Sequence, residues 1–438
     1  RRLLGYAIAS RILVLSLIVF WRSLISPYDT SASINPPCLS ASSEYRKPRV
    51  LLPRLGASLE SSIVWDGVYF VRIAECGYEY EQTYAFLPLL PFFISVLSKT
   101  VFAPLIPVIG IRAVLAFSGY VLNNIAFVFA ALYLYRLSLV VLVDPELALR
   151  SSVLFCFNPA SIFYSSLYSE SLFALLSFGG LYYIMRGSDY RASFWFALST
   201  FVRSNGILNA GYICFRKLLQ VTEDFLYRKG TFLASLRNLL IGALCSLFVV
   251  IPFISFQAYG YSNICKGRHL TEITPPWCKA RLPLLYSYIQ SHYWGVGFLK
   301  YFQVKQVPNF LLGSPILSLS ICSIVYYSKL YLSLGLKGEQ HIQPLKDSET
   351  AQVQQNFADI LPFIVHSAFM SATALLVMHV QVATRFLSAS PLLYWFGSSQ
   401  LMGCTCIGGR RWGYVIWAYC AAYILIGGLL FSNFYPFT

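Results

Sequence analysis

The stretch that decides how this chain is interpreted, residues 64–78, reads Val64-Trp65-Asp66-Gly67-Val68-Tyr69-Phe70-Val71-Arg72-Ile73-Ala74-Glu75-Cys76-Gly77-Tyr78. It follows the first strongly apolar segment and precedes the rest of the apolar chain. The stretch sets an acid beside aromatic side chains and an arginine, and a carboxylate against an apolar wall can act as a general base. A membrane enzyme with this arrangement holds its base in water while its lipid substrates stay in the bilayer.

Composition places most of the chain in lipid. The 438 residues are 57% hydrophobic and 12% charged, whereas a soluble domain carries about 25% charged residues. Because a membrane-spanning helix needs roughly 20 apolar residues, the chain has room for roughly ten to twelve membrane helices, broken and re-entrant ones included. We predict an all-α polytopic membrane protein with a single domain over residues 1–438.

The net charge of +15 has a simpler explanation than nucleic-acid binding, which we exclude. Basic residues gather at membrane borders and set the orientation of the chain, and they also attract anionic lipid head groups.

Eleven cysteines form no CxxC cluster, so a zinc site is not expected. Two cysteine pairs each share a predicted aqueous loop, Cys38 with Cys76 and Cys265 with Cys278; disulfides and free thiols both remain open for them.

Charge and hydropathy predict the topology. Arg1-Arg2 precedes an apolar segment over residues 3–21, which reads as a signal-anchor helix whose start faces the cytosol. The long polar region over residues 22–84 would then be lumenal, and its part over residues 55–74 has the spacing of one helix lying on the membrane surface. Residues 261–306 form a second lumenal loop, and residues 337–355 a polar cytosolic loop.

Several apolar segments look broken. Four prolines interrupt residues 86–107, and Asn158-Pro159 divides residues 149–185 into two spans. Arg203-Ser204-Asn205-Gly206 interrupts residues 192–215, which lie between basic turns; both turns can be cytosolic if this segment is a hairpin of half-length helices. Unbroken spans are predicted over residues 108–135, 239–259, 310–334, 360–380, 386–402 and 414–430.

Asp66 is the candidate catalytic residue. An acid in an arbitrary loop is more often a helix N-cap or a surface group, but the neighbours of this one favour a site. Trp65 and Tyr69 can wall a sugar pocket or lie at the membrane interface, and Arg72 can pair with a phosphate. Glu75 lies nine residues after Asp66 and so faces another side of a helix, which makes it the second choice of base.

Six blocks of sequence, in order along the chain, resemble those of polyprenyl-phosphate-dependent glycosyltransferases of the GT-C fold. More narrowly, the chain is similar to the family of the second mannosyltransferase of glycosylphosphatidylinositol (GPI) anchor assembly. The first and last blocks are the most specific to this family. The blocks cover residues 65–78, 85–91, 157–163, 168–174, 202–206 and 379–387.

The resemblance implies a donor, dolichol-phosphate mannose, and an acceptor, a GPI precursor lipid that already bears one mannose. It implies an α-1,6 linkage, formed in the lumen of the endoplasmic reticulum by a multi-pass membrane protein. A β-linked donor and an α-linked product need one inverting displacement, with Asp66 as base. No general acid is needed because the leaving group is a lipid phosphate. No Asp-x-Asp pair is present, so we expect neither a metal nor another cofactor; a small partner subunit in the same membrane stays open.

The leaving phosphate needs cations or hydrogen-bond donors, and Arg72, Arg203 and Arg385 are candidates, with Gln381 beside the last. Arg385 can equally be a residue that snorkels to the interface. For Arg203, structural pairing competes with function. Glu170 either orients the site or holds an arginine. His379, the one histidine inside a matching block, reads first as a structural residue.

Other classes of function stay open at this stage. A lipid or solute transporter also has broken helices and buried charge, although the long loop with its acid and the lack of an internal repeat argue against one. An assembly subunit without chemistry would tolerate replacement of Asp66. Within the leading class, a dolichol-phosphate-mannose transferase with another acceptor is the alternative.

Overall fold

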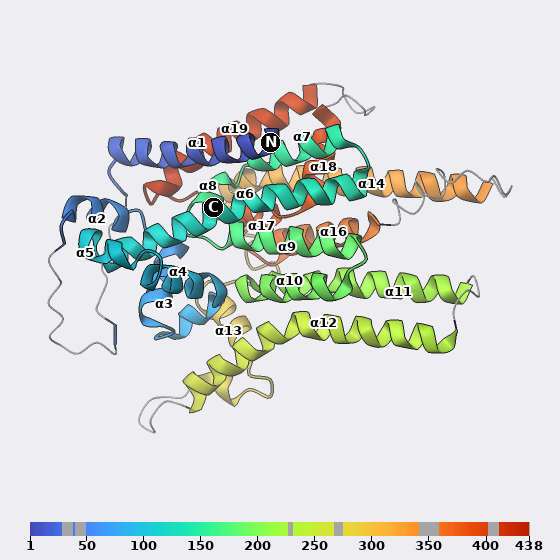
Figure 1. Ribbon diagram of the computed structural model, residues 1–438, viewed down its shortest axis with the longest axis horizontal. Coiled ribbons are helices and arrows are strands. Elements are labelled where there is room, and N and C mark those ends of the chain that lie inside the picture. Colours follow the sequence, from blue (N-terminus) through green and yellow to red (C-terminus); the bar gives the residue numbers. More distant parts are fainter. Residues whose placement is uncertain are drawn as a thin grey trace.

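The structure is a computed structural model that describes residues 1–28, 38–39, 50–226, 231–266, 275–340, 359–401 and 411–437. Within these ranges the regular secondary structure is helical, with no strand (Figure 1). The all-α class expected from the sequence is confirmed.

Among the described residues, five helices are long and apolar enough to cross a membrane: α1 (Arg2–Leu24), α6 (Ile111–Leu142), α12 (Phe232–Tyr261), α14 (Val307–Gln340) and α19 (Arg411–Ser432). A sixth candidate, either a broken span or a re-entrant loop, is the pair formed by α4 (Leu89–Lys99) and the segment that ends in α5 (Ile106–Ile109), bent by 68°. This bent pair is the proline-interrupted segment over residues 86–107. Two shorter apolar helices are α9 (Glu170–Met185) and α16 (Leu361–Leu376).

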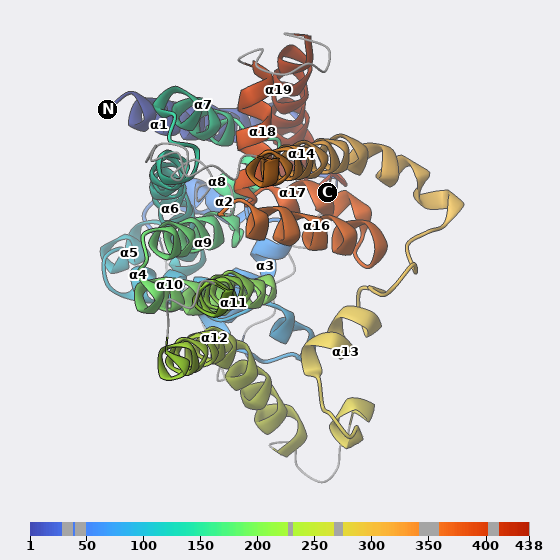
Figure 2. The ribbon, with the colours of Figure 1, turned by 90° about the vertical axis from the view of Figure 1, so that its right-hand side faces the viewer.

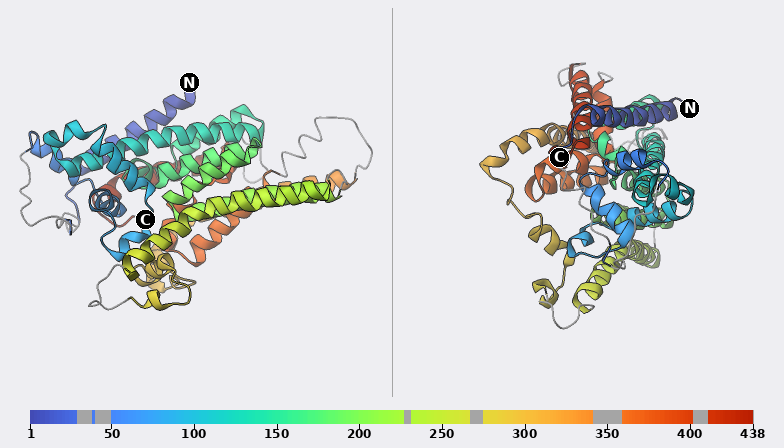
Figure 3. Two further views of the ribbon diagram at one scale, coloured as in Figure 1. Left: turned by 60° about the horizontal axis from the view of Figure 1, so that its bottom comes forward. Right: turned by 90° about the vertical axis from the view of Figure 1, so that its left-hand side faces the viewer.

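The long helices run side by side, and short helices gather at one end of the bundle (Figures 1 and 3). At this end, on the left of Figure 1, lie α2 to α5 and α13 (Leu285–His292). The connection from α9 to α10 (Asp189–Val202) lies at the opposite end. We call the first end the loop end. The main core forms around α6, which packs against α4, α7 (Pro145–Cys156) and α9.

The first long loop contains two helices where the sequence predicted one. The expected helix over residues 55–74 is instead α2 (Pro53–Glu60) and α3 (Asp66–Cys76). Between them, the hydroxyls of Ser61 and Ser62 donate to the carbonyls of Ser58 and Leu59 at 2.9 and 2.6 Å. Serine side chains that bond nearby backbone compete with helix continuation, and Trp65 then turns the chain at φ 53°. The prediction of a single surface helix was therefore wrong.

The break at Asn158-Pro159 is confirmed, with α7 before it and α8 (Ser161–Ser165) after it. The Asn158 amide donates to the Phe155 carbonyl at 2.7 Å and accepts from the Ala160 N–H at 2.8 Å. A buried arginine of α1, Arg11, donates to the carbonyls of Cys156 and Ser161 at 3.0 and 3.1 Å. The break thus exposes carbonyl groups that a charged side chain from another span satisfies.

The hairpin predicted over residues 192–215 is confirmed. Helix α10 runs toward the loop end, the 3₁₀ segment Ser204–Asn209 turns the chain, and α11 (Ala210–Leu226) runs back. Helix α12 packs against both arms, and Figure 2 shows α10 and α11 next to one another beside α12. Gly206 leaves no room for a side chain, because a Cβ there would lie 2.6 Å from the Thr200 nitrogen.

Two of the three predicted C-terminal spans match single helices, but the span predicted as unbroken over residues 386–402 is divided before Pro391, a residue that begins a helix more readily than it continues one. Helix α16 is followed by the short α17 (Ala383–Leu387), by α18 (Pro391–Leu401) and by α19. The polar loop expected over residues 337–355 lies mostly outside the described residues. Its first part belongs to α14, which continues to Gln340.

The two long loops are joined at the loop end. Glu81 of the first loop accepts hydrogen bonds from Trp277 Nε1 at 2.5 Å and from the Tyr293 hydroxyl at 2.9 Å, both in the second loop. Disulfides link Cys38 to Cys76 and Cys265 to Cys278. Of the two alternatives left open by the sequence, the structure thus has both pairs oxidised.

Candidate functional site

Asp66 is the first residue of α3, at the sharp turn made by Trp65. Its N–H donates to the hydroxyl of Tyr168 at 3.2 Å, which ties the start of the helix to the segment between α8 and α9. An acid in the first turn of a helix is favoured by the helix dipole. The Asp66 side chain is 31% exposed, so the carboxylate is held by the fold and still reachable.

Four charged side chains from four parts of the chain meet at this point. Arg385 Nη1 lies 2.7 Å from Asp66 Oδ2 and 3.8 Å from Glu170 Oε1. Arg203 also forms a salt bridge with Glu170 and donates to Ser169 Oγ at 3.3 Å. Two acids and two arginines balance in charge, which reduces the penalty for placing them in a largely apolar protein.

Glu170 is a buried carboxylate that contacts both Arg203 and Arg385. Its side chain is 2% exposed, and it does not line the cavity described next. A buried carboxylate between two guanidinium groups orients both of them. The sequence left open whether Glu170 shapes the site or holds an arginine, and the geometry has it holding Arg203 and Arg385.

A cavity of about 540 Å³ opens beside the cluster. Asp66, Arg203 and Arg385 line it, together with aromatic and polar side chains from the second loop and apolar side chains of the hairpin turn and of the segment that follows α16. The volume is that of a pocket for a small ligand or for the head of a larger one. Its second-loop residues are Tyr286, Gln290, Trp294 and Val296.

The charges and rings around the cavity affect one another. Burial opposes the charge on Arg385, but the carboxylates of Asp66 and Glu170 outweigh it and raise the pKa of the guanidinium. Burial, and next the Asp66 carboxylate, raise the pKa of the Tyr69 phenol. Arg385 also lies over the ring of Tyr168, 5.3 Å from its centre. The cavity therefore has a permanently cationic wall beside a carboxylate.

The two aromatic candidates beside Asp66 pack on other rings. Trp65 stacks on Phe434 at 4.9 Å, and Tyr69 stacks on Phe86 at 4.6 Å. Phe86 itself lines the cavity. Tyr69 thus supports a wall of the pocket from behind, and neither Trp65 nor Tyr69 is among the lining residues.

Arg72 is not brought to the cavity. It forms a salt bridge with Glu79 at 2.5 Å, in which both side chains are buried. Six residues after Asp66 on a helix of 3.6 residues per turn, Arg72 points to a different side of α3. Arg72 is the candidate phosphate ligand nearest to Asp66 in sequence, and the structure thus places it away from the Asp66 carboxylate.

Gln381 and His379 surround one ring of the second loop. The Gln381 side chain accepts a hydrogen bond from the Tyr301 hydroxyl, and His379 stacks on Tyr301 at 4.6 Å. His379 lines the cavity, whereas Gln381 does not. Burial lowers the pKa of His379, and a hydrogen bond to the backbone at Trp294 opposes that shift in part.

Sequence reasoning missed the contribution of the second loop to the cavity. Tyr286 joins the hairpin turn by accepting from Ser204 Oγ at 2.7 Å, and its N–H donates to Gln257 at 2.9 Å. The enrichment of this loop in Tyr and Trp is the sequence signal that could have indicated this contribution. Tyr168, which accepts from the Asp66 N–H, lies inside a block that was singled out, yet it was not named as a candidate.

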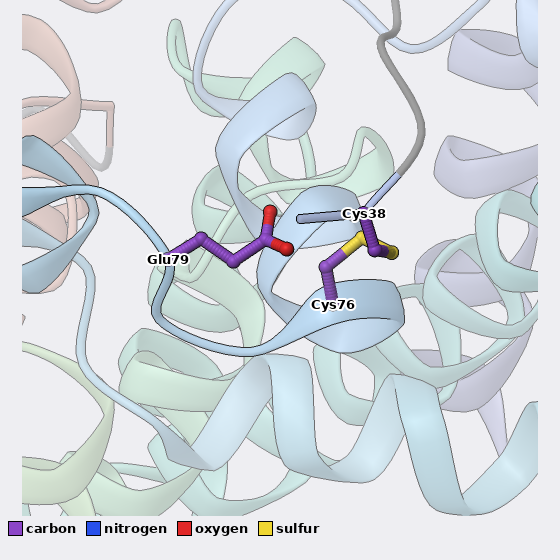
Figure 4. Close-up of side chains that lie close together, drawn as sticks. All are labelled: Cys38, Cys76 and Glu79. Atoms are coloured by element: carbon purple, nitrogen blue, oxygen red, sulfur yellow. A yellow bond between two sulfur atoms is a disulfide. The ribbon is translucent and has the colours of Figure 1, made fainter. Parts of the chain in front are cut away.

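A group of potential metal ligands lies at the other end of α3 (Figure 4). Cys38, Cys76 and Glu79 lie within 4.8 Å of one another, measured between ligand atoms. The two sulfurs are joined as a disulfide, so neither is a thiolate. The Glu79 carboxylate accepts from Arg72 and from the Leu39 N–H. We therefore interpret the group as a structural link between the first loop and the end of α3 rather than as a metal site.

Comparison with known proteins identifies relatives over nearly the whole chain. A family model described as "Mannosyltransferase (PIG-V)" matches residues 1–438. GPI alpha-1,6-mannosyltransferase 2 of Homo sapiens is 34% identical over 431 residues, which cover 92% of this chain and 84% of the relative. GPI mannosyltransferase 2 of Drosophila melanogaster is 31% identical over 406 residues, covering 85% and 86%. The Schizosaccharomyces pombe protein of the same name is 29% identical over 377 residues, covering 86% and 73%. No solved structure matches the chain.

Proposed function

The chain belongs to the PIG-V mannosyltransferase family. From that premise we propose that it transfers the second mannose of the GPI anchor. The donor is dolichol-phosphate mannose, the acceptor is a precursor lipid bearing one mannose, and the new linkage is α-1,6. The names of the relatives support this acceptor and linkage. The observation that carries the proposal is the carboxylate of Asp66 at the rim of a cavity that also has the cationic side chains of Arg203 and Arg385.

Asp66 acts as the general base. Of its two carboxylate oxygens, Oδ2 pairs with Arg385, and within the described residues no hydrogen bond reaches Oδ1. That oxygen takes the proton of the acceptor 6-hydroxyl while the hydroxyl oxygen attacks C1 of the donor mannose. The bond from C1 to the phosphate oxygen breaks in the same step, so the β-linked donor gives an α-linked product.

The two arginines serve the leaving group. The lipid phosphate departs as an anion and needs no proton, so positive charge and hydrogen-bond donors are sufficient. Nε of Arg385 is buried and has no hydrogen-bond partner among the described residues, which leaves a donor for a phosphate oxygen. Glu170 holds Arg203 and Arg385 next to each other, so that both face one phosphate.

We assign the loop end to the lumen of the endoplasmic reticulum, and the turn between α9 and α10 to the cytosol. Both disulfides belong to the two loops at that end, and disulfides persist in oxidising compartments such as this lumen. The cavity lies at the same end, between the hairpin turn and the second loop. The same assignment makes residues 22–84 and 261–306 lumenal.

The experiment that tests the function uses the purified full-length chain in lipid nanodiscs with dolichol-phosphate mannose and the singly mannosylated precursor. We expect a product with one more mannose, in an α-1,6 linkage that nuclear magnetic resonance identifies. Cells that lack the chain should accumulate the singly mannosylated lipid. Accumulation of a different intermediate would assign another acceptor, and the absence of transfer to any lipid would refute the enzymatic proposal.

A further inference from the structure

A second cavity, of about 710 Å³, lies between α1, α2 and α6 and shares no lining residue with the first. Helices α1 and α6 are both candidate membrane spans. Along them the lining is mainly apolar, with Leu15, Ile18, Phe117 and Val121, and the amide of Asn124, which also lines it, accepts from Ser165 Oγ at 3.0 Å. We call this cavity the α1–α6 groove. Its apolar part fits the hydrocarbon chains of a lipid.

At the loop end the lining of the groove changes to polar. Arg22 is held there by hydrogen bonds to the Ser432 carbonyl and to Ser61 Oγ, both at 2.7 Å. Within the described residues, no carboxylate lies within 4.0 Å of this arginine, and the groove is lined by no Asp or Glu. A half-buried cation without an acid partner attracts an anion. The other polar groups here are mainly hydroxyls, from Ser23, Ser58, Ser61, Ser62 and Tyr120.

This chemistry selects among lipids. A choline or ethanolamine head carries its own cation, for which the described residues of the lining provide no acid. A lipid whose phosphate carries a polyol satisfies both the arginine and the hydroxyls. Phosphatidylinositol has this structure, and it is also the lipid part of a GPI precursor. We propose that the α1–α6 groove binds the phosphatidylinositol part of the acceptor, with Arg22 on its phosphate; this rests on the proposed function.

The groove lies close enough to the base for one acceptor to reach both. Ser62 lines the groove and Asp66 lines the first cavity, and four residues of fully extended chain span at most about 14 Å. The Tyr120 hydroxyl donates to the Ser62 carbonyl at 3.2 Å and so fixes the boundary between them. The phosphate and acyl chains stay in the groove, while the short glycan passes Trp65 and brings the terminal mannose to Asp66.

Steady-state kinetics of the full-length chain in nanodiscs test the assignment. Arg22→Gln removes the cation but keeps a hydrogen-bond donor, and Val121→Trp fills the groove while leaving Arg22 in place. Each should raise KM for the singly mannosylated GPI precursor about tenfold or more, the size of a charge-assisted contact, with KM for dolichol-phosphate mannose unchanged. With the acceptor glycan alone, lacking phosphate and acyl chains, both variants should match the unmodified protein.

Arg54→Gln is the matched control, because Arg54 is an exposed arginine of α2 that does not line the groove. It should leave both KM values unchanged. An unchanged acceptor KM in both groove variants would overturn the inference. So would an equal rise in both substrate KM values with a lower melting temperature, because that outcome indicates a structural lipid.

A binding measurement separates failure of this inference from failure of the proposed function. If the unmodified protein transfers no mannose to the precursor, the proposed function fails and the kinetics above cannot be read. Native mass spectrometry with dioleoyl phosphatidylinositol then tests lipid binding in the α1–α6 groove independently of the transfer reaction. We expect binding to the unmodified protein, loss of binding in both groove variants, and no comparable binding of dioleoyl phosphatidylcholine; equal binding of the two lipids would overturn the assignment.

Discussion

Arg385 and Asp66 lie 319 residues apart in sequence and form a salt bridge in which Arg385 Nη1 is 2.7 Å from Asp66 Oδ2. The contact joins the start of α3 to the short helix α17 and closes one wall of the cavity. Because the same Nη1 also lies 3.8 Å from Glu170, loss of one acid still leaves the arginine a partner. Separate substitutions can therefore test Asp66 as the base, Arg385 as the phosphate ligand and Glu170 as their buried support.

Replacement of Asp66 by Asn should abolish most of the transfer. Asn keeps the shape of the side chain and its capacity to accept from Arg385, but it cannot take a proton. We expect kcat to fall by at least ~10²-fold, the usual size of a general-base effect, with normal expression. Glu75→Gln is the control, because Glu75 is on the same helix and contacts Arg112 at 4.0 Å instead. Near-normal turnover of Asp66→Asn would remove Asp66 from the mechanism.

Replacement of Arg385 should weaken use of the donor. Lys keeps the charge but loses the fork of guanidinium donors, so Arg385→Lys should raise KM for dolichol-phosphate mannose about tenfold, and Arg385→Ala about 10²-fold. Donor titrations at saturating acceptor give these values. If kcat falls in both variants while the donor KM stays constant, Arg385 positions Asp66 and does not bind the phosphate.

Glu170→Gln should destabilise the fold as well as slow the reaction. Glu170 is nearly fully buried between Arg203 and Arg385, and removal of one partner from a buried ion pair costs about 3–5 kcal/mol. Thermal unfolding in detergent should show a clearly lower melting temperature. Glu146→Gln is the comparison, since the exposed Glu146–Arg150 pair should contribute less than about 1 kcal/mol. Equal small effects of the two substitutions would mean that the cluster does not depend on Glu170.

The sequence predicted the class of the fold and the order of its segments because hydropathy and helix breakers act locally. Pro159, the Arg203–Gly206 interruption and the prolines after Phe86 all mark real breaks. A break that the sequence did not predict, at Ser61 and Ser62, depends on side-chain hydrogen bonds to the preceding carbonyls. Two adjacent serines are compatible with a continuing helix as well, so the apolar spacing outweighed them in the prediction.

The sequence predicted which residues form the candidate site better than it predicted how they contact one another. Asp66, Arg203 and Arg385 were all named from their sequence blocks, and all three line one cavity. Their contacts with one another join segments that are far apart in the chain, which a single sequence does not reveal. Arg72 illustrates the opposite error, since proximity in sequence suggested a shared site although helical geometry turns it toward Glu79.

Transfer should not require a divalent metal. The sequence has no Asp-x-Asp pair, and the ligand group found at Cys38, Cys76 and Glu79 is a disulfide beside a carboxylate that is already bonded. Activity of the purified enzyme in excess chelator should therefore equal that in chelator-free buffer. A parallel sample with added magnesium or manganese provides the control. Loss of activity in chelator that either ion restores would contradict the expectation.

Acidification should destabilise the protein partly through His379. Burial lowers the pKa of this histidine below its ordinary value of 6.5, so folding favours the neutral ring. A group of this kind contributes its full stability above the ordinary pKa and loses it as the pH falls below that value. Between about pH 7.5 and pH 5.5, the melting temperature of the unmodified protein should therefore fall more than that of His379→Gln. His292→Gln, at an exposed histidine of α13, should behave like the unmodified protein. An equal fall in all three proteins would assign the acid sensitivity to other groups.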